Sequence, residues 1–144
     1  MKLIQHLERF PRYNSYLPWA RSSETSLIYV VDNEGEIIEL YTIVLEATGF
    51  TVKGFKDRSE ALAELEETTA RPNLIIMDYL GHSMSAERFI LRSLAVHPTL
   101  RILMASGLSR NDLRFSNVRP NRFIRKPFTA EEFIHEVKAA LWMR

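Results

Sequence analysis

Apolar and polar residues follow two different patterns along the chain, beginning near Leu27. Short, nearly uninterrupted apolar runs are typical of buried strands, whereas apolar residues that recur three or four positions apart are typical of helices with one buried face. The runs predict five strands, over residues 27–31, 50–55, 74–77, 100–105 and 122–125. Helical spacing predicts helices that contain the apolar stripes at residues 37–45, 61–65, 89–94 and 133–141.

One further helix is predicted over residues 109–118, where the helical pattern is weakest because the stretch is short and polar. Its apolar anchors are Leu113, Phe115 and Val118. Two other helix starts carry a clearer signal, the three-residue spacing of a capping box, in which a side chain at each end bonds to the backbone N–H of the other. The two pairs are Asp57 with Glu60 and Thr129 with Glu132.

The composition of the runs suggests an order for the strands. The first and third runs are wholly apolar, as expected for parallel strands covered on both faces, whereas Thr51 and Lys53 interrupt the second run and Arg122 and Arg125 the fifth. Alternation of strands and helices favours a parallel sheet with right-handed crossovers. We therefore expect an α/β fold with a doubly wound, five-stranded parallel sheet in the order 2-1-3-4-5, whose switch point lies between strands one and three.

The chain of 144 residues has room for one ordinary domain, so we look for one site. We expect this domain over residues 27–144. Residues 1–26 differ from the rest, because Pro11, Pro18 and a polar run interrupt any long periodic pattern. We expect them to be an N-terminal extension that docks on the domain or binds a partner.

The charge and the cysteine count exclude several classes of protein. Nineteen Lys and Arg against eighteen Asp and Glu give a net charge of +1, which favours direct binding neither to nucleic acid nor to an anionic membrane. Without cysteine there is no disulfide framework and no thiolate metal site. No apolar run has the length of a signal peptide core or a membrane span, so we expect a cytoplasmic protein.

Polar residues with useful chemistry follow four of the five predicted strands. Asp32 and Asn33 follow the first, Asp78 the third, Ser106 the fourth and Lys126 the fifth. Ligands of such sheets bind beyond the carboxyl ends of the strands, at the switch point. Two carboxylates, a hydroxyl and an ammonium are therefore expected to converge on one rim of the sheet.

This set of groups suits phosphoryl transfer. Neighbouring carboxylates repel each other unless a cation neutralises them, and Mg²⁺ takes carboxylate, carbonyl and water oxygens as ligands. Asp78 is then a candidate nucleophile toward phosphorus, while the metal and Lys126 neutralise charge and Ser106 donates a hydrogen bond to the product.

Four segments of the chain, LIYVVDNE, NLIIMD, ILMASG and FIRKPF, resemble in order and spacing the motifs of the receiver domains of two-component response regulators. The resemblance covers about residues 27–141. It implies the flavodoxin-like receiver fold, and phosphorylation of Asp78 by a partner histidine kinase or phosphotransfer protein. It implies a signalling protein with a downstream protein partner rather than an enzyme, and it is compatible with a homodimer.

The resemblance also implies roles for individual residues. Asp32, Asp78 and the backbone carbonyl of Leu80 are the implied Mg²⁺ ligands, with Asn33 as a further candidate. Ser106 and Lys126 are implied contacts of the phosphoryl group. Ser106 and Phe123 take the positions of the switch pair, in which an aromatic ring turns inward when the hydroxyl moves toward the phosphoryl group.

Two departures from the family pattern bear on this site. Family members usually have two acids where this chain has Asp32 and Asn33, so we expect Mg²⁺ to bind weakly. The loop after Asp78 also differs, with Ala86 at a position where a glycine is usual.

Other functions remain open at this point. A pseudo-receiver would keep the fold as a protein-interaction module that works without phosphorylation, and Asn33 favours it. A phosphatase with an aspartyl intermediate usually has a second acid two residues after the nucleophile, where this chain has Leu80. A flavin-binding module needs a phosphate cradle after the first strand, where this chain has acidic residues.

Overall fold

The computed structural model describes residues 26–81 and 83–142. The expected N-terminal extension, apart from Ser26, lies outside the described residues. The five predicted strands are present as β1 (Leu27–Val31), β2 (Thr51–Phe55), β3 (Leu74–Met77), β4 (Arg101–Ser106) and β5 (Arg122–Arg125). They form one parallel sheet in the order β2-β1-β3-β4-β5, which confirms the predicted topology.

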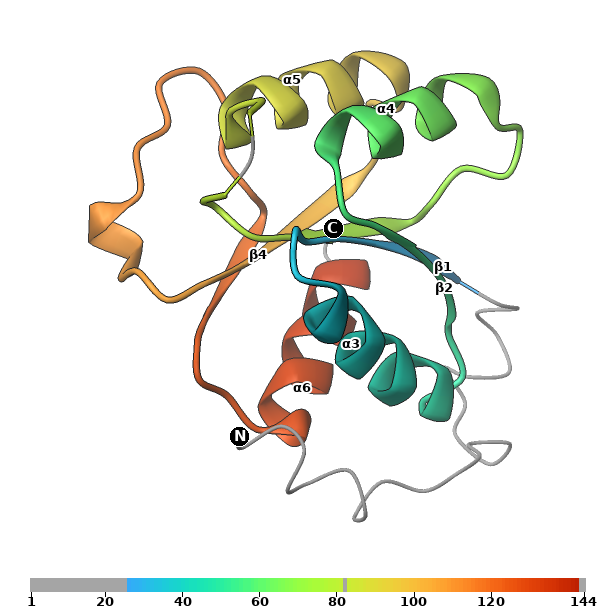
Figure 1. The fold of residues 1–144 in the computed structure, drawn as a ribbon, viewed down its shortest axis with the longest axis vertical. Coiled ribbons are helices and arrows are strands. Elements are labelled where there is room, and N and C mark those ends of the chain that lie inside the picture. The colour runs from blue at the N-terminus through green and yellow to red at the C-terminus, as the bar shows by residue number, and fades with distance from the viewer. Residues whose placement is uncertain (1–25, 82, 143–144) are drawn as a thin grey trace.

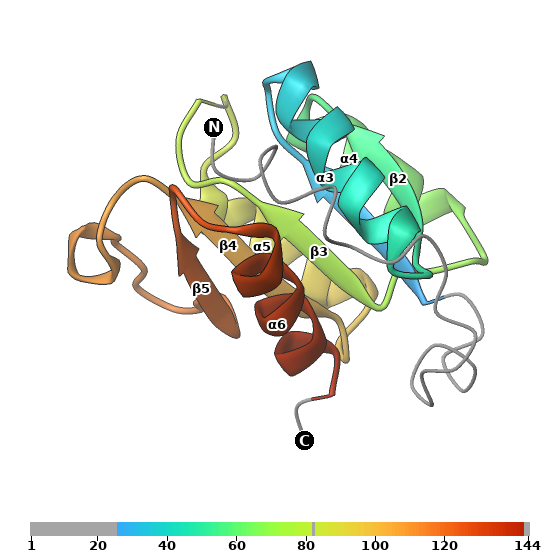
Figure 2. The ribbon, with the colours of Figure 1, turned by 90° about the horizontal axis from the view of Figure 1, so that it is seen from below.

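Four α-helices of the described chain cover the two faces of this sheet (Figures 1 and 2). Helices α3 (Gly35–Ala47) and α6 (Ala130–Leu141) lie on one face, and α4 (Arg58–Glu67) and α5 (Ala86–Val96) lie on the other. None of the helices in these residues is both long enough and apolar enough to span a bilayer.

The alternation of side chains along β1 divides the core into two layers, because successive residues of a strand point to opposite faces. Ile28 and Val30 pack with α3 and α6, whereas Tyr29 and Val31 pack with α4 and α5. All four are buried. The central strands therefore have apolar neighbours on both faces, and polar chemistry is confined to their ends.

Close packing of α3 on the edge strand β2 depends on a glycine. A Cβ atom at Gly54 would lie 2.3 Å from Cγ2 of Ile38 on α3. The missing side chain thus allows α3 to approach the sheet, and α3 begins directly after the site-bearing end of β1.

The helix starts predicted at Asp57 and Thr129 are confirmed. Thr129 and Glu132 form the complete capping box at the start of α6. Asp57 caps α4 by accepting a hydrogen bond from the backbone N–H of Ser59, the residue before Glu60. Ser85 caps α5 in the same manner through Arg88.

The helix predicted over residues 109–118 is wrong. Only a short 3-10 turn, η2 (Arg110–Asp112), forms there, within the long connection that projects to one side in Figure 1. The backbone of the following residues bonds to side chains instead of to itself. The Tyr79 hydroxyl accepts from the N–H of Arg114, and the Glu87 carboxylate accepts from the N–H groups of residues 116–118. These bonds take the place of helical ones.

Candidate functional site

The carboxyl ends of β1, β3, β4 and β5 bring the sequence-predicted residues to the same edge of the sheet. A pocket of about 190 Å³ opens there, and Asp78, Ser106 and Lys126 all line it, with the side chain of Leu108 beside them. These residues come from three separate segments of the chain, so the doubly wound topology assembles the pocket.

Asp32 lies at the end of β1 and is only 3% exposed. Its Oδ1 atom accepts a hydrogen bond of 2.9 Å from the backbone N–H of Glu34. Its Oδ2 atom lies 3.8 Å from Nζ of Lys126, so the two predicted residues form an ion pair across the rim. Asp32 is therefore fixed in place by contacts on both of its oxygens.

The carboxylates of this edge act electrostatically on one buried phenol. Burial raises the pKa of Tyr41 on α3, and the negative charges of Asp32, Asp78 and Glu34 raise it further. The three carboxylates therefore lie close enough to act on the same hydroxyl.

Asn33 lies beside the loop that follows β3. Gly81 in that loop has a φ of 90°, a conformation that favours glycine, and a Cβ atom there would lie 2.7 Å from Nδ2 of Asn33. The Asn33 side chain is thus a neighbour of the segment that contains Leu80, whose own side chain is 61% exposed.

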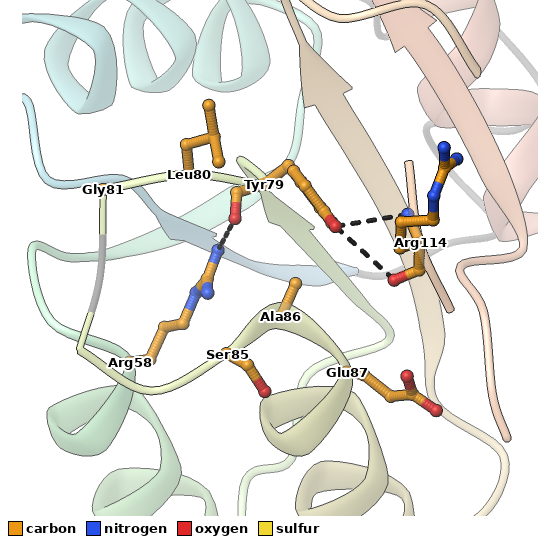
Figure 3. Close-up of a pocket in the computed structure, with 8 residues that line it drawn as sticks. All are labelled: Arg58, Tyr79, Leu80, Gly81, Ser85, Ala86, Glu87 and Arg114. Carbon is orange, nitrogen blue, oxygen red and sulfur yellow. Dashed lines mark hydrogen bonds between the residues drawn. The ribbon is translucent and has the colours of Figure 1, made fainter. Parts of the chain in front are cut away.

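Arg58 was not predicted, and the structure places it directly behind Asp78. It is the first residue of α4 and is 1% exposed. One guanidinium nitrogen donates to the backbone carbonyls of Asp78 and Tyr79 and lies 3.8 Å from Oδ1 of Asp78. Another donates to the carbonyl of Met84, 2.7 Å away. Figure 3 shows the guanidinium directed at the Tyr79 carbonyl, so one side chain ties both ends of the loop after the candidate phosphoacceptor.

The charge of Arg58 is stabilised by the acids of the site. Burial lowers the pKa of Arg58, while the negative charges of Asp78 and Asp32 act in the opposite direction. An arginine remains a cation under either influence at neutral pH, because its ordinary pKa is above 12. The site therefore contains a permanent internal positive charge.

Ser106 and Lys126 are held by the backbone at the ends of β4 and β5. The backbone N–H of Lys126 donates to the Ser106 carbonyl at 2.8 Å, and the bond between Lys126 and Pro127 is cis. The Ser106 hydroxyl accepts from the N–H of Leu108 at 3.1 Å. A hydroxyl that accepts this turn bond can still donate its own hydrogen.

Phe123, the predicted switch aromatic, lies on β5 and is half-buried. Its ring centroid is 6.5 Å from that of Phe115, and the Arg110 guanidinium carbon lies 4.8 Å from its centroid. Phe115 in turn meets Tyr79 edge-on at 5.7 Å. The Tyr79 hydroxyl reaches the backbone of Arg114, as Figure 3 shows. Aromatic contacts thus connect the residue after Asp78 with Phe123.

The donors at this edge match a hard divalent cation. Within residues 26–81 and 83–142, no three or more acidic or histidine side chains are grouped as a metal cluster. The candidate ligands are instead two carboxylates, of Asp32 and Asp78, with the Leu80 carbonyl and the Asn33 amide nearby. Mg²⁺ commonly binds through one or two carboxylates and completes its octahedron with carbonyl and water oxygens, so this set fits Mg²⁺.

The amino-acid sequence is similar to those of known response regulators, although no protein-family model matches the chain. The phosphate regulon transcriptional regulatory protein PhoB of Pseudomonas aeruginosa is 28% identical over 118 residues, 79% of this chain and 51% of that protein. The nitrogen assimilation regulatory protein NtrX of Azorhizobium caulinodans is 29% identical over 118 residues, 79% of this chain and 26% of that protein. The chain spans about half the length, or less, of these curated relatives.

The fold is similar to those of solved receiver domains. A CheY-like receiver domain protein from Methanospirillum hungatei superposes with a TM-score of 0.73 at 24% identity, over 81% of this chain and 94% of that one. A response regulator receiver protein from Sinorhizobium medicae gives a TM-score of 0.72 at 22% identity, over 82% and 95% of the two chains. These similarities concern the fold alone.

Proposed function

Since this chain is a receiver domain of the response-regulator type in its fold and its sequence resemblance, we propose that it is a phosphoacceptor signalling domain with Asp78 as the acceptor. The supporting observation is the pocket at the carboxyl ends of the strands, which Asp78 shares with Ser106 and Lys126. A nucleophile, a hydrogen-bond donor and a cation around one small pocket are what phosphoryl transfer requires.

In the proposed reaction, a carboxylate oxygen of Asp78 attacks the phosphorus atom of a phosphohistidine. The new O–P bond forms as the P–N bond breaks, and the leaving imidazole nitrogen takes up a proton. Lys126 neutralises charge on the phosphoryl oxygens, and the Ser106 hydroxyl donates a hydrogen bond to one of them. The product is an aspartyl phosphate on this chain.

Asp32, Asp78 and the Leu80 carbonyl would hold Mg²⁺, with Asn33 as a further oxygen ligand. When bound, the metal supplies positive charge at the equatorial phosphoryl oxygens. Asp32 is suited to this role because its buried carboxylate is already fixed by the Glu34 N–H.

The phosphoryl group would act through Ser106 and Phe123 on the surface around β5. We propose that a histidine kinase or phosphotransfer protein donates the phosphoryl group and that a second protein binds the surface around β5. We place this function in the cytoplasm, without direct contact of the chain with nucleic acid or membrane. Residues 27–144 would be the receiver domain, and residues 1–26 an extension that docks on it or binds a partner. Pairing of two receiver copies is compatible with this function.

Intact-mass measurement tests the proposal. Incubation with acetyl phosphate or phosphoramidate and Mg²⁺ is expected to add one phosphoryl group, which Asp78→Asn abolishes. Asp57→Asn is the matched control, because Asp57 caps α4 outside the pocket. An unchanged wild-type mass, or a modified Asp78→Asn protein, would exclude the proposal and favour the phosphorylation-independent interaction module.

A further inference from the structure

The buried guanidinium of Arg58 has no role in the proposed phosphoryl transfer, and burying its charge is costly. A charged group loses its hydration on burial and is retained inside a protein only where partners compensate it. Hydrogen bonds do not fully compensate the lost hydration of the Arg58 guanidinium, because its Nε atom has no hydrogen-bond partner. The remaining compensation is electrostatic, and the negative charges that act on it are those of Asp78 and Asp32.

The charges at this edge form two pairs of equal separation. Arg58 lies 3.8 Å from Asp78, and Lys126 lies 3.8 Å from Asp32. The four charges of these pairs sum to zero. With a neutral residue in place of Arg58 the sum would be −1, and with an acid also in place of Asn33 it would be −2. Arg58 and Asn33 therefore change the local charge in the same direction, away from a strong cation site.

The hydrogen bonds of Arg58 have a second consequence, which is geometric. The carbonyls of Asp78 and Tyr79 lie at the beginning of the loop after β3, and that of Met84 lies near its end. A planar guanidinium with donors in fixed directions can bond to both ends at once, which a single ammonium group cannot do in the same way. Arg58 thereby fixes the backbone on either side of Leu80.

We propose that Arg58 is a positioning residue of this site with two effects: it fixes the loop that presents the Leu80 carbonyl, and its charge weakens the binding of a divalent cation beside Asp78. This inference rests on the proposed function for the identity of the site. Asp78 is then neutralised in part by an internal cation that does not dissociate, so the unphosphorylated domain stays largely free of metal at low Mg²⁺ concentration.

The test is a Mg²⁺ titration of the unphosphorylated chain, followed by amide NMR shifts and by calorimetry. Arg58→Gln removes the charge and is expected to lower the Kd for Mg²⁺ by roughly tenfold. Arg58→Lys keeps the charge and is expected to bind Mg²⁺ within about threefold of wild type. Arg122→Gln is the matched control and leaves the Kd unchanged, because Arg122 pairs with Glu136 at the opposite end of β5.

Amide hydrogen exchange provides the second readout. Both Arg58 variants are expected to lose protection in the loop after β3 and in the first turn of α5, whereas Arg122→Gln is not. An Arg58→Gln protein that folds but binds Mg²⁺ no more tightly than wild type overturns the effect of charge. Unchanged loop protection in Arg58→Lys overturns the positioning effect.

If Arg58→Gln does not fold, the Kd for Mg²⁺ and the loop protection of Arg58→Lys test the proposal. A Kd shifted by more than about threefold in that variant contradicts the role of charge, and a Kd within threefold together with a loosened loop supports the inference. The result is separable from that of the phosphorylation assay. A chain that takes no phosphoryl group but shows the expected Mg²⁺ response refutes the proposed function alone, whereas a phosphorylated chain without that response refutes this inference alone.

Discussion

Asp32 and Asn33 are neighbours at the end of β1, yet their side chains have different surroundings. Asp32 is buried and fixed by the Glu34 N–H and by Lys126. Asn33 is exposed and lies beside Gly81 in the loop after β3. An acid at residue 33 would therefore approach a bound Mg²⁺ from the solvent side, where the desolvation of its own charge costs little free energy.

Asn33→Asp is accordingly expected to tighten Mg²⁺ binding. One added charge beside a partly solvated cation contributes about 1–3 kcal/mol at an effective dielectric near 20, after the repulsion among carboxylates is discounted. Calorimetric titration of the two proteins measures the difference. Equal affinities would show that residue 33 lies outside the cation site, and Glu66→Gln on the surface of α4 is a charge control that should change nothing.

The residues of the site differ in how readily the sequence identifies them. Asp32, Asp78, Ser106 and Lys126 could be predicted because each directly follows a predicted strand, and the ends of parallel strands meet at one edge. Arg58 was missed because an arginine at a helix start is ordinarily exposed. A signal was nevertheless present: the buried stripe of α4, which comprises Ala61, Leu62 and Leu65, extends back by one turn to residue 58.

At the level of single elements, the strands were predictable and one helix was not. The charged and polar residues of β2 and β5 correctly marked the sheet edges, because strands covered on both faces are mostly apolar. The stretch over residues 109–118 has little apolar content, so a helix there would bury little apolar surface and would gain little stability. What forms in its place depends on Tyr79 and Glu87, which lie about thirty residues earlier in the chain, and local periodicity carries no information about such contacts.

The contact between Glu87 and this connection is expected to depend on pH. Hydrogen bonds from the backbone N–H groups of Ser116 and Asn117 lower the pKa of Glu87 below its ordinary value of 4.5. Because the folded pKa is depressed, the stabilisation is complete above pH 4.5 and is lost as the pH falls through the folded value. Amide shifts of Ser116 and Asn117 should therefore titrate with a midpoint below 4.5.

Glu87→Gln should abolish that titration and reduce the protection of residues 116–118 at neutral pH. Glu66→Gln, which removes an exposed glutamate from α4, should preserve both. Identical amide titrations in the wild type and in Glu87→Gln would mean that another acid controls the conformation of the connection.

At the scale of the whole molecule, a residue that lines the pocket also contacts the connection between β4 and β5. Tyr79 lines the pocket of Asp78 and also bonds to Arg114. Phe123 contacts Phe115 and Arg110, both of which belong to the connection. If Ser106 moves toward a phosphoryl group, an inward turn of Phe123 must break these contacts and so alter the connection.

Beryllofluoride with Mg²⁺, which mimics the phosphoryl group, is therefore expected to change amide exchange within residues 107–125 and to leave residues 51–55 of the far edge strand unaffected. Exchange that is identical with and without the mimic throughout residues 107–125 would remove this mechanism. The Asp78→Asn protein, treated in the same way, separates a response at the acceptor from an unspecific effect of the reagent.

The irregular connection between β4 and β5 also has consequences for conformational entropy. A helix is stabilised by bonds within its own backbone and forms or melts cooperatively. By contrast, the backbone N–H groups of residues 114 and 116–118 bond to the side chains of Tyr79 and Glu87. When one residue of this segment loses its ordered conformation, the regained backbone entropy contributes about 1–2 kcal/mol of free energy at 25 °C. This gain offsets much of the stability that the lost hydrogen bond contributed. A partner that binds this segment would select one conformer from several of similar free energy, and ordering the remaining residues would reduce its affinity.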